Sequence, residues 1–429
     1  MRLEDSPVPF RDGSYDIPAS CYTSLDFAAR EWEFMWPHVW LLAAHVSDLT
    51  APGDHVASAM GRATILVTRD RAGDIRAFHN ICRHRGLLLV PHGSGRNPKC
   101  EFTCNYHGWV WGTDGNLSKA PRAKEIPGGL DPSRVKLKEV AVDTYAGFVW
   151  VCLGEPSLPL EEYLGLPGRQ IAAYKPETFV RTETYTSHWK CNWKVAVEAF
   201  SEPYHVAATH PQVADFATPE DGTITYMEPH GRLTVELGVI GPLASEARRK
   251  RSIVIDLLEN EFGTDTRNVR DDVQAARQLL QKTMRETMRT RGIELEDVSD
   301  AQLTDTQQYF LFPNVHLDFH GANSMSIFRY RPHARNPGES YFDSWDLARP
   351  NVGRDREPNG DLETVRPIPE LPLVVRQDAE IVERIQVGME SGYFEGPLFH
   401  QLEGRLLLMH QYLNRFFERG ADALRMPAD

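Results

Sequence analysis

Two cysteine–histidine pairs are the residues of this sequence best suited to bind a metal. Cys82 and His84 lie two positions apart in NICRHRG, and Cys104 and His107 lie three positions apart in FTCNYHGW. Thiolates favour zinc or iron–sulfur clusters and a neutral imidazole suits both, so the residue types leave both metals open. Because each loop supplies one Cys and one His, the arrangement favours a [2Fe–2S] cluster with two Cys on one iron and two His on the other.

The other four cysteines provide no second set of ligands. Cys100 is close to the second loop, but Cys104 has the right offset to His107. We interpret the remaining thiols as ordinary buried side chains. They are Cys21, Cys100, Cys152 and Cys191. A structural zinc site remains the alternative for the two pairs.

Two further histidines could hold a second metal. His205 and His210 lie five positions apart in the helix-like run NWKVAVEAFSEPYHVAATHP, where Pro203 should loosen the turn and Pro211 should end the helix. Two imidazoles and one carboxylate form the triad of non-haem Fe(II) oxygenases and leave coordination positions open. Such a pair alone would more often be structural, but the neighbouring cluster motif favours iron.

Both constellations resemble one known family. CRHRG and CNYHGW look like the two Rieske cluster loops, and NWK, Glu198 and EPYH resemble the iron helix of the large (alpha) subunits of Rieske non-haem iron oxygenases. The resemblance to these aromatic-ring-hydroxylating dioxygenases covers most of the chain and is weakest between 215 and 305. It implies an α+β fold, with an N-terminal all-β Rieske [2Fe–2S] domain and a helix-grip (Bet v 1-like) catalytic domain that has an antiparallel sheet and mononuclear iron.

The resemblance also implies the remaining site residues. Asp378, in VRQDAEIVERIQVGM, is expected to be the iron carboxylate, with Glu380 as the alternative. Glu202 takes the place of the family carboxylate that links the iron site to a cluster ligand, which would be His107 of a neighbouring subunit. Tyr106 and Trp109 are expected to shield the cluster.

Two positions depart from the usual pattern of ring-hydroxylating dioxygenases. Most have Asp where this chain has Glu202, and many have Asn where it has Ala199. These departures leave the substrate class and the reaction outcome open. For Glu198, a solvated charge on the helix surface and a functional role are equally consistent with the sequence. Other histidines are expected to be structural or pocket-lining: His316, His320, His333, His400 and His410.

The elements that must position these residues fall into three expected units. Residues 1–37 should be an N-terminal helical segment on the catalytic domain, 38–155 the Rieske domain and 156–429 the catalytic domain. A helix is expected over 24–36, β-rich runs over 40–155, and a domain boundary at EPSLPLEEYLGLPG. Surface helices are expected in 245–300, then strands in TQQYFLFPNVHLDF and NSMSIFRYRP, and closing helices in QDAEIVERIQVGMES and EGRLLLMHQYLNRFFERG.

Composition excludes several classes of partner. The net charge of −13 argues against nucleic acid, and no run reaches the eighteen apolar residues of a membrane span. With no signal peptide visible in MRLEDSPVPFRDG, we expect a cytoplasmic protein. The basic run Arg248, Arg249, Lys250 and Arg251 is expected to be a solvated face, with docking of an acidic ferredoxin as the alternative.

The expected function is that of a terminal oxygenase component. It would use O2 and electrons from NAD(P)H to hydroxylate, and more specifically dihydroxylate, an aromatic or alicyclic hydrophobic substrate. The chain has no GxGxxG fingerprint, so a separate flavin reductase, with or without a ferredoxin, should supply the electrons. The resemblance implies a homotrimer, with or without a small beta subunit. The alternative is a monooxygenase that carries out N- or O-demethylation, for example of a quaternary amine or a methoxy-aromatic.

Overall fold

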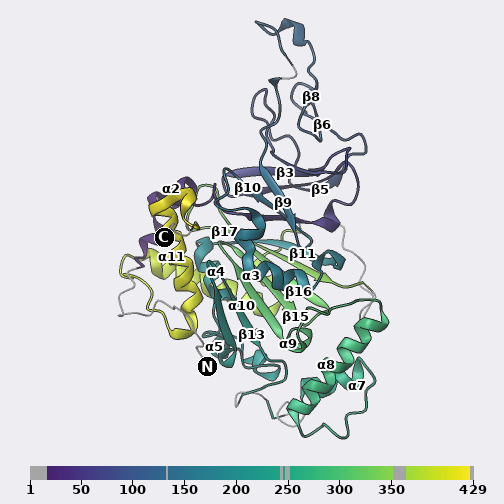
Figure 1. Cartoon of the computed structure of the whole chain (residues 1–429). Helices are drawn as coiled ribbons and strands as arrows, with labels where there is room; N and C mark the ends of the chain where they lie inside the picture. The colour runs from purple at the N-terminus through teal and green to yellow at the C-terminus, as the bar shows by residue number, and fades with distance from the viewer. Residues whose placement is uncertain (1–16, 132–133, 242–244, 247–251, 351–363, 426–429) are drawn as a thin grey trace.

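The computed structural model describes residues 17–131, 134–241, 245–246, 252–350 and 364–425. It contains a β-rich part, at the top of Figure 1, and a larger part in which helices surround one wide sheet. The basic run at 248–251 lies outside the described residues. Within the described chain, no helix combines the length and apolar character needed to cross a membrane.

Two short helices begin the described chain, α1 (Ser20–Thr23) and α2 (Leu25–Phe34). The Ser24 hydroxyl accepts from the amides of Asp26 and Phe27, so the predicted cap of α2 is confirmed. The helix packs against α11 (Gly404–Arg419) from the other end of the chain, with Phe27 edge-on to Phe417. Figure 1 shows the same proximity at its left side.

In the part of it that the structure describes, the predicted β-rich region is confirmed as ten short strands in three antiparallel sheets. One sheet has the order β4-β3-β2-β5, another β6-β7-β8, and the third β1-β10-β9. The strands are β1 (Leu41–His45), β2 (Asp54–Met60), β3 (Ala63–Arg69), β4 (Ile75–His79), β5 (Gly93–Arg96), β6 (Glu101–Thr103), β7 (Val110–Gly112), β8 (Leu117–Lys119), β9 (Ala141–Tyr145) and β10 (Phe148–Cys152).

This region has a small apolar core of its own that includes the two expected thiol ligands. Cys82 and Cys104 are buried together with Phe78, Trp109 and Trp111. The core therefore fixes the base of both cysteine–histidine loops, while the ends of the loops remain free to face outward.

The Pro- and Gly-rich segment after β10 is helical. It forms α3 (Leu160–Ala173), which is interrupted where Gly165 adopts φ 49° and ψ −130°. Pro167 lies just beyond that break, in the first turn of the second helical piece, where its missing N–H costs no hydrogen bond. The segment that we expected to be a domain boundary is therefore helical from residue 160 onward.

The larger part is built on a seven-stranded antiparallel sheet of order β11-β17-β16-β15-β14-β13-β12. The strands predicted in TQQYFLFPNVHLDF and NSMSIFRYRP are confirmed as β14, β15 and β16. The strands are β11 (Val180–Trp189), β12 (Thr223–Met227), β13 (His230–Val235), β14 (Thr306–Leu311), β15 (Val315–His320), β16 (Ser324–Pro332) and β17 (Ser340–Ala348).

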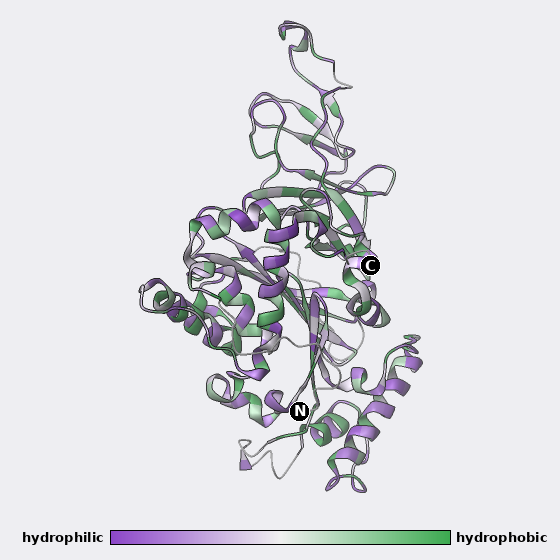
Figure 2. Cartoon of the chain, turned by 60° about the vertical axis from the view of Figure 1, so that its left-hand side comes forward, coloured by the Kyte–Doolittle hydropathy of each residue, from purple (hydrophilic) through white to green (hydrophobic). Residues whose placement is uncertain are grey.

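Helices cover this sheet and complete the α+β fold that the sequence predicts. The further helices are α4 (Trp193–Ser201), α5 (Val206–Thr209), α7 (Ile253–Asn260), α8 (Val273–Thr290), α9 (Asp300–Thr304) and α10 (Leu373–Glu390). Helix α4 packs on β15, β16 and β17, and α10 packs on α4. The surface helices α7 and α8 and the closing helices α10 and α11 are confirmed. Figure 2 shows helices with hydrophilic and hydrophobic residues on different parts of their surface, as expected for helices with one buried face.

Candidate metal centres

The two cysteine–histidine loops share one backbone arrangement. In the first, the Cys82 amide donates to the carbonyl five residues later (2.8 Å), and Gly86 N donates to Cys82 O (2.9 Å). In the second, the Cys104 amide again donates five residues ahead (2.8 Å), and Gly108 N donates to Cys104 O (3.0 Å). Gly86 and Gly108 have φ of 77° and 71°, a conformation that favours glycine. The shared pattern makes the two loops a structural pair.

Within this pair of loops, the thiols point inward and the imidazoles lie at the surface. Cys82 and Cys104 are only 2% and 3% exposed, whereas His84 and His107 are exposed. The two imidazole rings meet edge to face, with centroids 4.6 Å apart. The two loops therefore present two thiols on the inner side of the site and two imidazoles on its outer side.

The spread of these four residues fits two irons better than one zinc. Zn–N and Zn–S bonds of about 2.0–2.3 Å would hold four ligand atoms within about 4 Å of one another. Among the described residues, the only group of three or more potential ligands whose atoms all lie within 4.8 Å of one another is at the other site. The loop residues are therefore spread too widely for one tetrahedral ion as they stand. A [2Fe–2S] cluster needs two thiols on the side of one iron and two imidazoles on the side of the other, and the buried thiols and exposed imidazoles are arranged in this way.

The two aromatic residues of the second loop lie against different histidines. Trp109 is buried and stacks on the His84 ring, with centroids 4.9 Å apart and planes at 7°. Tyr106 lies 3.8 Å from the His107 ring but remains 54% exposed, and its hydroxyl accepts from Arg85. Trp109 is thus placed to shield the site from water, whereas Tyr106 leaves the His107 side open.

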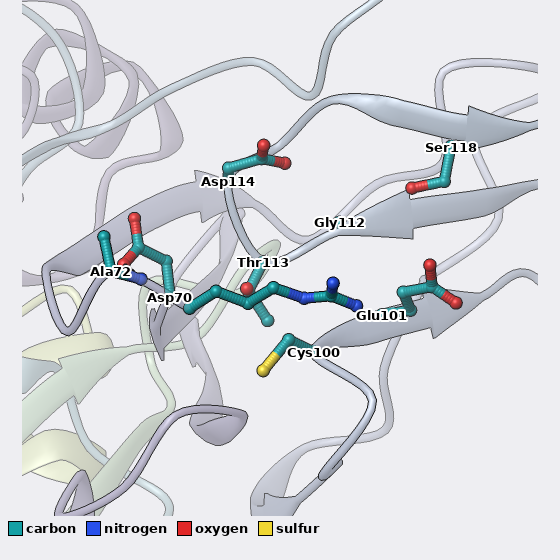
Figure 3. A pocket seen from close by; sticks show the side chains of 9 residues that line it. Asp70, Ala72, Cys100, Glu101, Gly112, Thr113, Asp114 and Ser118 are labelled. Atoms are coloured by element: carbon teal, nitrogen blue, oxygen red, sulfur yellow. Dashed lines mark hydrogen bonds between the residues drawn. The ribbon is translucent and has the colours of Figure 1, made fainter.

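Cys100 occupies a separate hollow of the β-rich part. Figure 3 shows its sulfur among Asp70, Thr113 and other residues of neighbouring turns, and none of the four expected cluster ligands lines that hollow. All six cysteines are buried and free of disulfides. This placement agrees with our interpretation of Cys100 as an ordinary buried thiol.

The second group brings together His205, His210 and Asp378. His210 Nε2 lies 2.8 Å from Asp378 Oδ1 and 3.3 Å from His205 Nε2. His205 Nε2 lies 3.4 Å from the same Asp378 oxygen. These ligand atoms fall within 4.8 Å of one another, as a single ion requires. Glu380, the alternative carboxylate, is exposed and is not part of this group.

A break in the helical run creates this geometry. Helix α4 ends at Ser201, Glu202 is extended with φ −138° and ψ 146°, and His205 is the N-cap of the short α5. His210 follows α5 with φ −123° and ψ 59°, outside the helical region, as is usual for a residue before proline. The predicted breaks at Pro203 and Pro211 are present.

Hydrogen bonds on the far side of each imidazole orient its Nε2 atom. His205 Nδ1 donates to Glu202 Oε1 (2.5 Å), and His210 Nδ1 donates to Gln377 Oε1 (2.9 Å). Metal-binding histidines usually donate their second ring N–H in this way. Burial lowers the pKa of His205, but hydrogen bonds to Asp378 and Glu202 outweigh it and raise that pKa to about 10. The two carboxylates thus favour positive charge at this place.

Sequence reasoning missed Gln377, although it directly precedes Asp378. It also missed a buried cluster around Glu198, which is 8% exposed. Glu198 Oε1 accepts from the Tyr22 hydroxyl (2.8 Å) and lies 2.7 Å from His410 Nε2. The solvated alternative for Glu198 was wrong, and its contact with the buried His410 agrees with a structural role for that histidine. No local signal could have found this cluster, because its members lie 176 and 212 residues from Glu198.

A cavity of about 380 Å³ adjoins the triad. The helical wall includes the three triad residues, and the opposite wall comes from the sheet. Its lining is mostly apolar, with Ala199, Phe200, Pro203, Val206, Val213, Phe216, Ala217, Pro219, Leu233, Val235, Leu237, Phe328, Val374 and Val375. The polar lining outside the triad is Glu202, Thr306, Gln308, Asp318 and His320. The volume falls in the range of about 300–1,000 Å³ typical of small-molecule sites.

Curated relatives match parts of the chain. The large oxygenase component of a naphthalene 1,2-dioxygenase system from Pseudomonas aeruginosa is 38% identical over 187 residues, 42% of this chain and 41% of the relative. The carnitine monooxygenase oxygenase subunit of Escherichia coli (strain K12) is 30% identical over 232 residues, 53% of this chain and 60% of the relative. The chain thus spans about two to three fifths of the length of these relatives in the matched regions.

Solved structures share the fold over nearly the whole chain. A quaternary ammonium Rieske monooxygenase in complex with L-carnitine superposes with a TM-score of 0.68 at 19% identity, covering 94% of this chain and 96% of that one. Naphthalene 1,2-dioxygenase from Rhodococcus sp. bound to indole gives 0.64 at 17% identity, with 95% of both chains covered. At these identities the likeness concerns the fold.

Family models assign both parts of the sequence. Residues 39–141 match the Rieske [2Fe-2S] domain, and residues 176–419, more than half of the chain, match the ring hydroxylating alpha subunit (catalytic domain). The chain therefore belongs to the ring-hydroxylating alpha-subunit family, whose members combine a Rieske [2Fe–2S] domain with a catalytic domain that binds mononuclear iron.

Proposed function

We propose that this protein is the terminal oxygenase component of a multicomponent system that hydroxylates an aromatic or alicyclic substrate, with dihydroxylation as the main outcome. The observation that carries the proposal is the apolar cavity whose wall includes His205, His210 and Asp378. An apolar compound that fills the cavity would lie next to the metal ligands. It would also exclude water from the place where oxygen reacts.

In this proposal, Cys82, His84, Cys104 and His107 would hold the cluster, and His205, His210 and Asp378 would hold the iron. When bound, the cluster supplies single electrons and the mononuclear iron supplies O2 activation.

The surrounding residues of the chain have positioning roles. Glu202 and Gln377 hold the two imidazoles with Nε2 toward Asp378. Phe200 and Phe328 provide flat apolar walls against which a ring can lie.

We propose a homotrimer in which electrons pass between subunits. Its support is the arrangement in Figure 1, where the β6–β8 sheet of the cluster loops and helix α5 of the iron site lie at opposite ends of one chain. His107 is exposed, and Tyr204 beside Glu202 is 54% exposed, so both sites offer surface to a neighbour. Glu202 would link the iron site to His107 of a neighbouring subunit. Electrons would come from NAD(P)H through a separate flavin reductase, with or without a ferredoxin.

Oxidative demethylation is the second candidate. A monooxygenase reaction of this kind is favoured by Glu202, because Glu replaces the usual Asp at this place and the chain is 30% identical over 232 residues to a carnitine monooxygenase oxygenase subunit. The two reactions leave different products. Dihydroxylation places two oxygen atoms on one ring, whereas demethylation inserts one atom and releases formaldehyde.

Metal analysis tests the proposal before any substrate is known. We expect about three irons and two sulfides per chain, and an EPR signal of Rieske type after reduction by dithionite. His205→Ala should lose about one iron and keep that signal. If wild type and His205→Ala both contain only two irons, the protein would be an electron carrier. Zinc without sulfide would reject both the oxygenase and the electron carrier. With a reductase added, ¹⁸O2 labelling of the product from naphthalene or a methoxy-aromatic would then distinguish dihydroxylation from demethylation.

A further inference from the structure

One carboxylate outside the metal site interrupts the apolar lining of the cavity. Asp318 on β15 is 7% exposed and lines the cavity. Its Oδ2 atom accepts from Gln308 Nε2 (3.3 Å), whereas Oδ1 is buried and has no hydrogen-bond partner among the described residues. A buried polar atom without a partner is rare and lowers stability. Because Asp318 lines the cavity, a turn of its side chain toward the cavity would bring Oδ1 within reach of a donor on a ligand.

The strand geometry turns Asp318 toward the helical wall. Alternate residues of a strand face the same side, so His316, Asp318 and His320 share one face of β15. His316 Nε2 contacts Ser201 Oγ on α4 at 3.0 Å, which identifies this face as the one covered by the helix. His320 lines the same cavity. Asp318 therefore lies across the cavity from the helices that carry the triad.

A purely structural role as counter-ion to Arg405 leaves the free oxygen unexplained. Arg405 is fully buried, and its Nη2 donates to Gln308 Oε1 (2.7 Å). Gln308 thus stands between Arg405 and Asp318. No ion pair within 4.0 Å joins Asp318 to any cation of the described chain, so Arg405 acts on Asp318 through space and through Gln308 alone.

The charge balance selects the kind of donor. Ionised Asp318 and Arg405 together carry no net charge, and the two charges of a bound Fe(II) would balance Asp378 and Glu202, so a cationic ligand would add an uncompensated charge to the site. A quaternary ammonium group, moreover, has no hydrogen to donate. Burial raises the pKa of Asp318 to about 7, while the hydrogen bond from Gln308 and the charge of Arg405 oppose that rise. A neutral O–H or N–H donor satisfies Oδ1 without disturbing this balance.

We propose that Asp318 is a specificity-determining residue of the oxygenase. It would accept a hydrogen bond from a hydroxyl or N–H group of an otherwise apolar, uncharged ring compound whose opposite end faces the triad. This inference rests on the proposed function, because it assumes that the cavity holds the substrate. It narrows the proposed substrates from aromatic or alicyclic compounds in general to ring compounds that carry one uncharged hydrogen-bond donor.

Binding to the iron-loaded protein tests this inference without turnover. Calorimetry would compare 2-naphthol with naphthalene, which has the same ring system but no donor, and with phenyltrimethylammonium as a cation. We expect wild-type protein to bind 2-naphthol at least about 10-fold more tightly than either. Asp318→Leu should abolish that preference while naphthalene affinity stays within about 3-fold. Thr306→Val, which changes another polar residue of the same lining, should preserve it.

The outcomes separate the inference from the function on which it rests. Equal affinity for 2-naphthol and naphthalene, no measurable binding of 2-naphthol, or a preference that survives Asp318→Leu would overturn the inference. Tightest binding of phenyltrimethylammonium would also overturn it and assign Asp318 to cations. Asp318→Asn, which keeps the shape and one acceptor, should weaken 2-naphthol binding by a smaller factor and covers the case in which the leucine variant does not fold. Failure of the oxygenase proposal itself would appear independently, as missing iron or sulfide.

Discussion

His210 and Asp378 meet at 2.8 Å across 168 residues of sequence, with Nε2 of the imidazole facing Oδ1 of the carboxylate. Asp378 is 4% exposed on α10, and His210 is 3% exposed at the end of α5. Two buried groups with these ligand atoms can share one ion with His205. Their contact links α10 to the broken helical run, on which α10 also packs through α4.

Removal of this carboxylate should remove the mononuclear iron alone. We expect Asp378→Ala to lower iron from about three to about two per chain, because the ion loses one of three protein ligands. The Rieske EPR signal should persist, since the cluster loops belong to a different core. The matched control is Glu380→Ala, two residues away on the exposed side of the same helix, and it should retain all iron. Equal iron loss in both variants would argue against Asp378 as the ligand.

Assembly of the cluster should require Cys82 and should not require Cys100. Cys82→Ser should eliminate the Rieske EPR signal and acid-labile sulfide, because a serine hydroxyl is a poor ligand for a soft iron–sulfur centre. Cys100→Ser changes an equally buried thiol of the same part of the chain, and we expect it to keep both properties. Sulfide lost from the Cys100 variant would reject our choice of ligands.

Glu202 should matter for turnover more than for cofactor content. In Glu202→Gln the amide oxygen can still accept from His205 Nδ1, but the negative charge is gone, and we expect oxygenation to fall about 10–100-fold. Iron, sulfide and the dithionite-reduced signal should stay at wild-type levels. Stopped-flow oxidation of the reduced cluster in the presence of O2 and substrate would locate the slow step. An unchanged rate would exclude Glu202 from the electron route.

Acid should destabilise the fold through buried neutral histidines. Burial lowers the pKa of His230 to about 4, and that of His45 to about 4 as well. In the unfolded chain both should titrate near 6.5. Between pH 6.5 and 4 the unfolded state therefore binds more protons, so the free energy of unfolding falls as pH falls through that window.

The contribution of His230 to this fall should reach about 3 kcal/mol at pH 4. Its two hydrogen bonds join Tyr163 O to the Phe312 amide, so His230→Gln is the variant that best preserves polarity. Urea unfolding at several pH values gives the free energy of unfolding as a function of pH. Between pH 6.5 and 4, that free energy should fall less steeply for His230→Gln than for wild type. Parallel dependences on pH for wild type and His230→Gln would contradict the assignment.

Local motifs made the cluster site predictable. Cys82 with His84, and Cys104 with His107, each lie within one short loop, so their spacing in sequence nearly fixes their spacing in space. The same holds for Pro203 and Pro211, whose effect on the backbone is intrinsic to proline. The long amphipathic runs of α10 and α11 were also predictable, because their apolar periodicity spans several turns.

Other features required the fold itself. Asp378 was named through resemblance, since nothing in its local sequence distinguishes it from Glu380, and only the packing of α10 turns one inward and the other outward. The Glu198 cluster and the free oxygen of Asp318 depend on contacts between distant segments and on which face of β15 the sheet buries. By itself, the sequence determined the metals that its loops can bind and the helices that its periodicity requires. The tertiary structure decided which carboxylates meet them, because a side chain's partners across a core are set by packing and not by its neighbours in the chain.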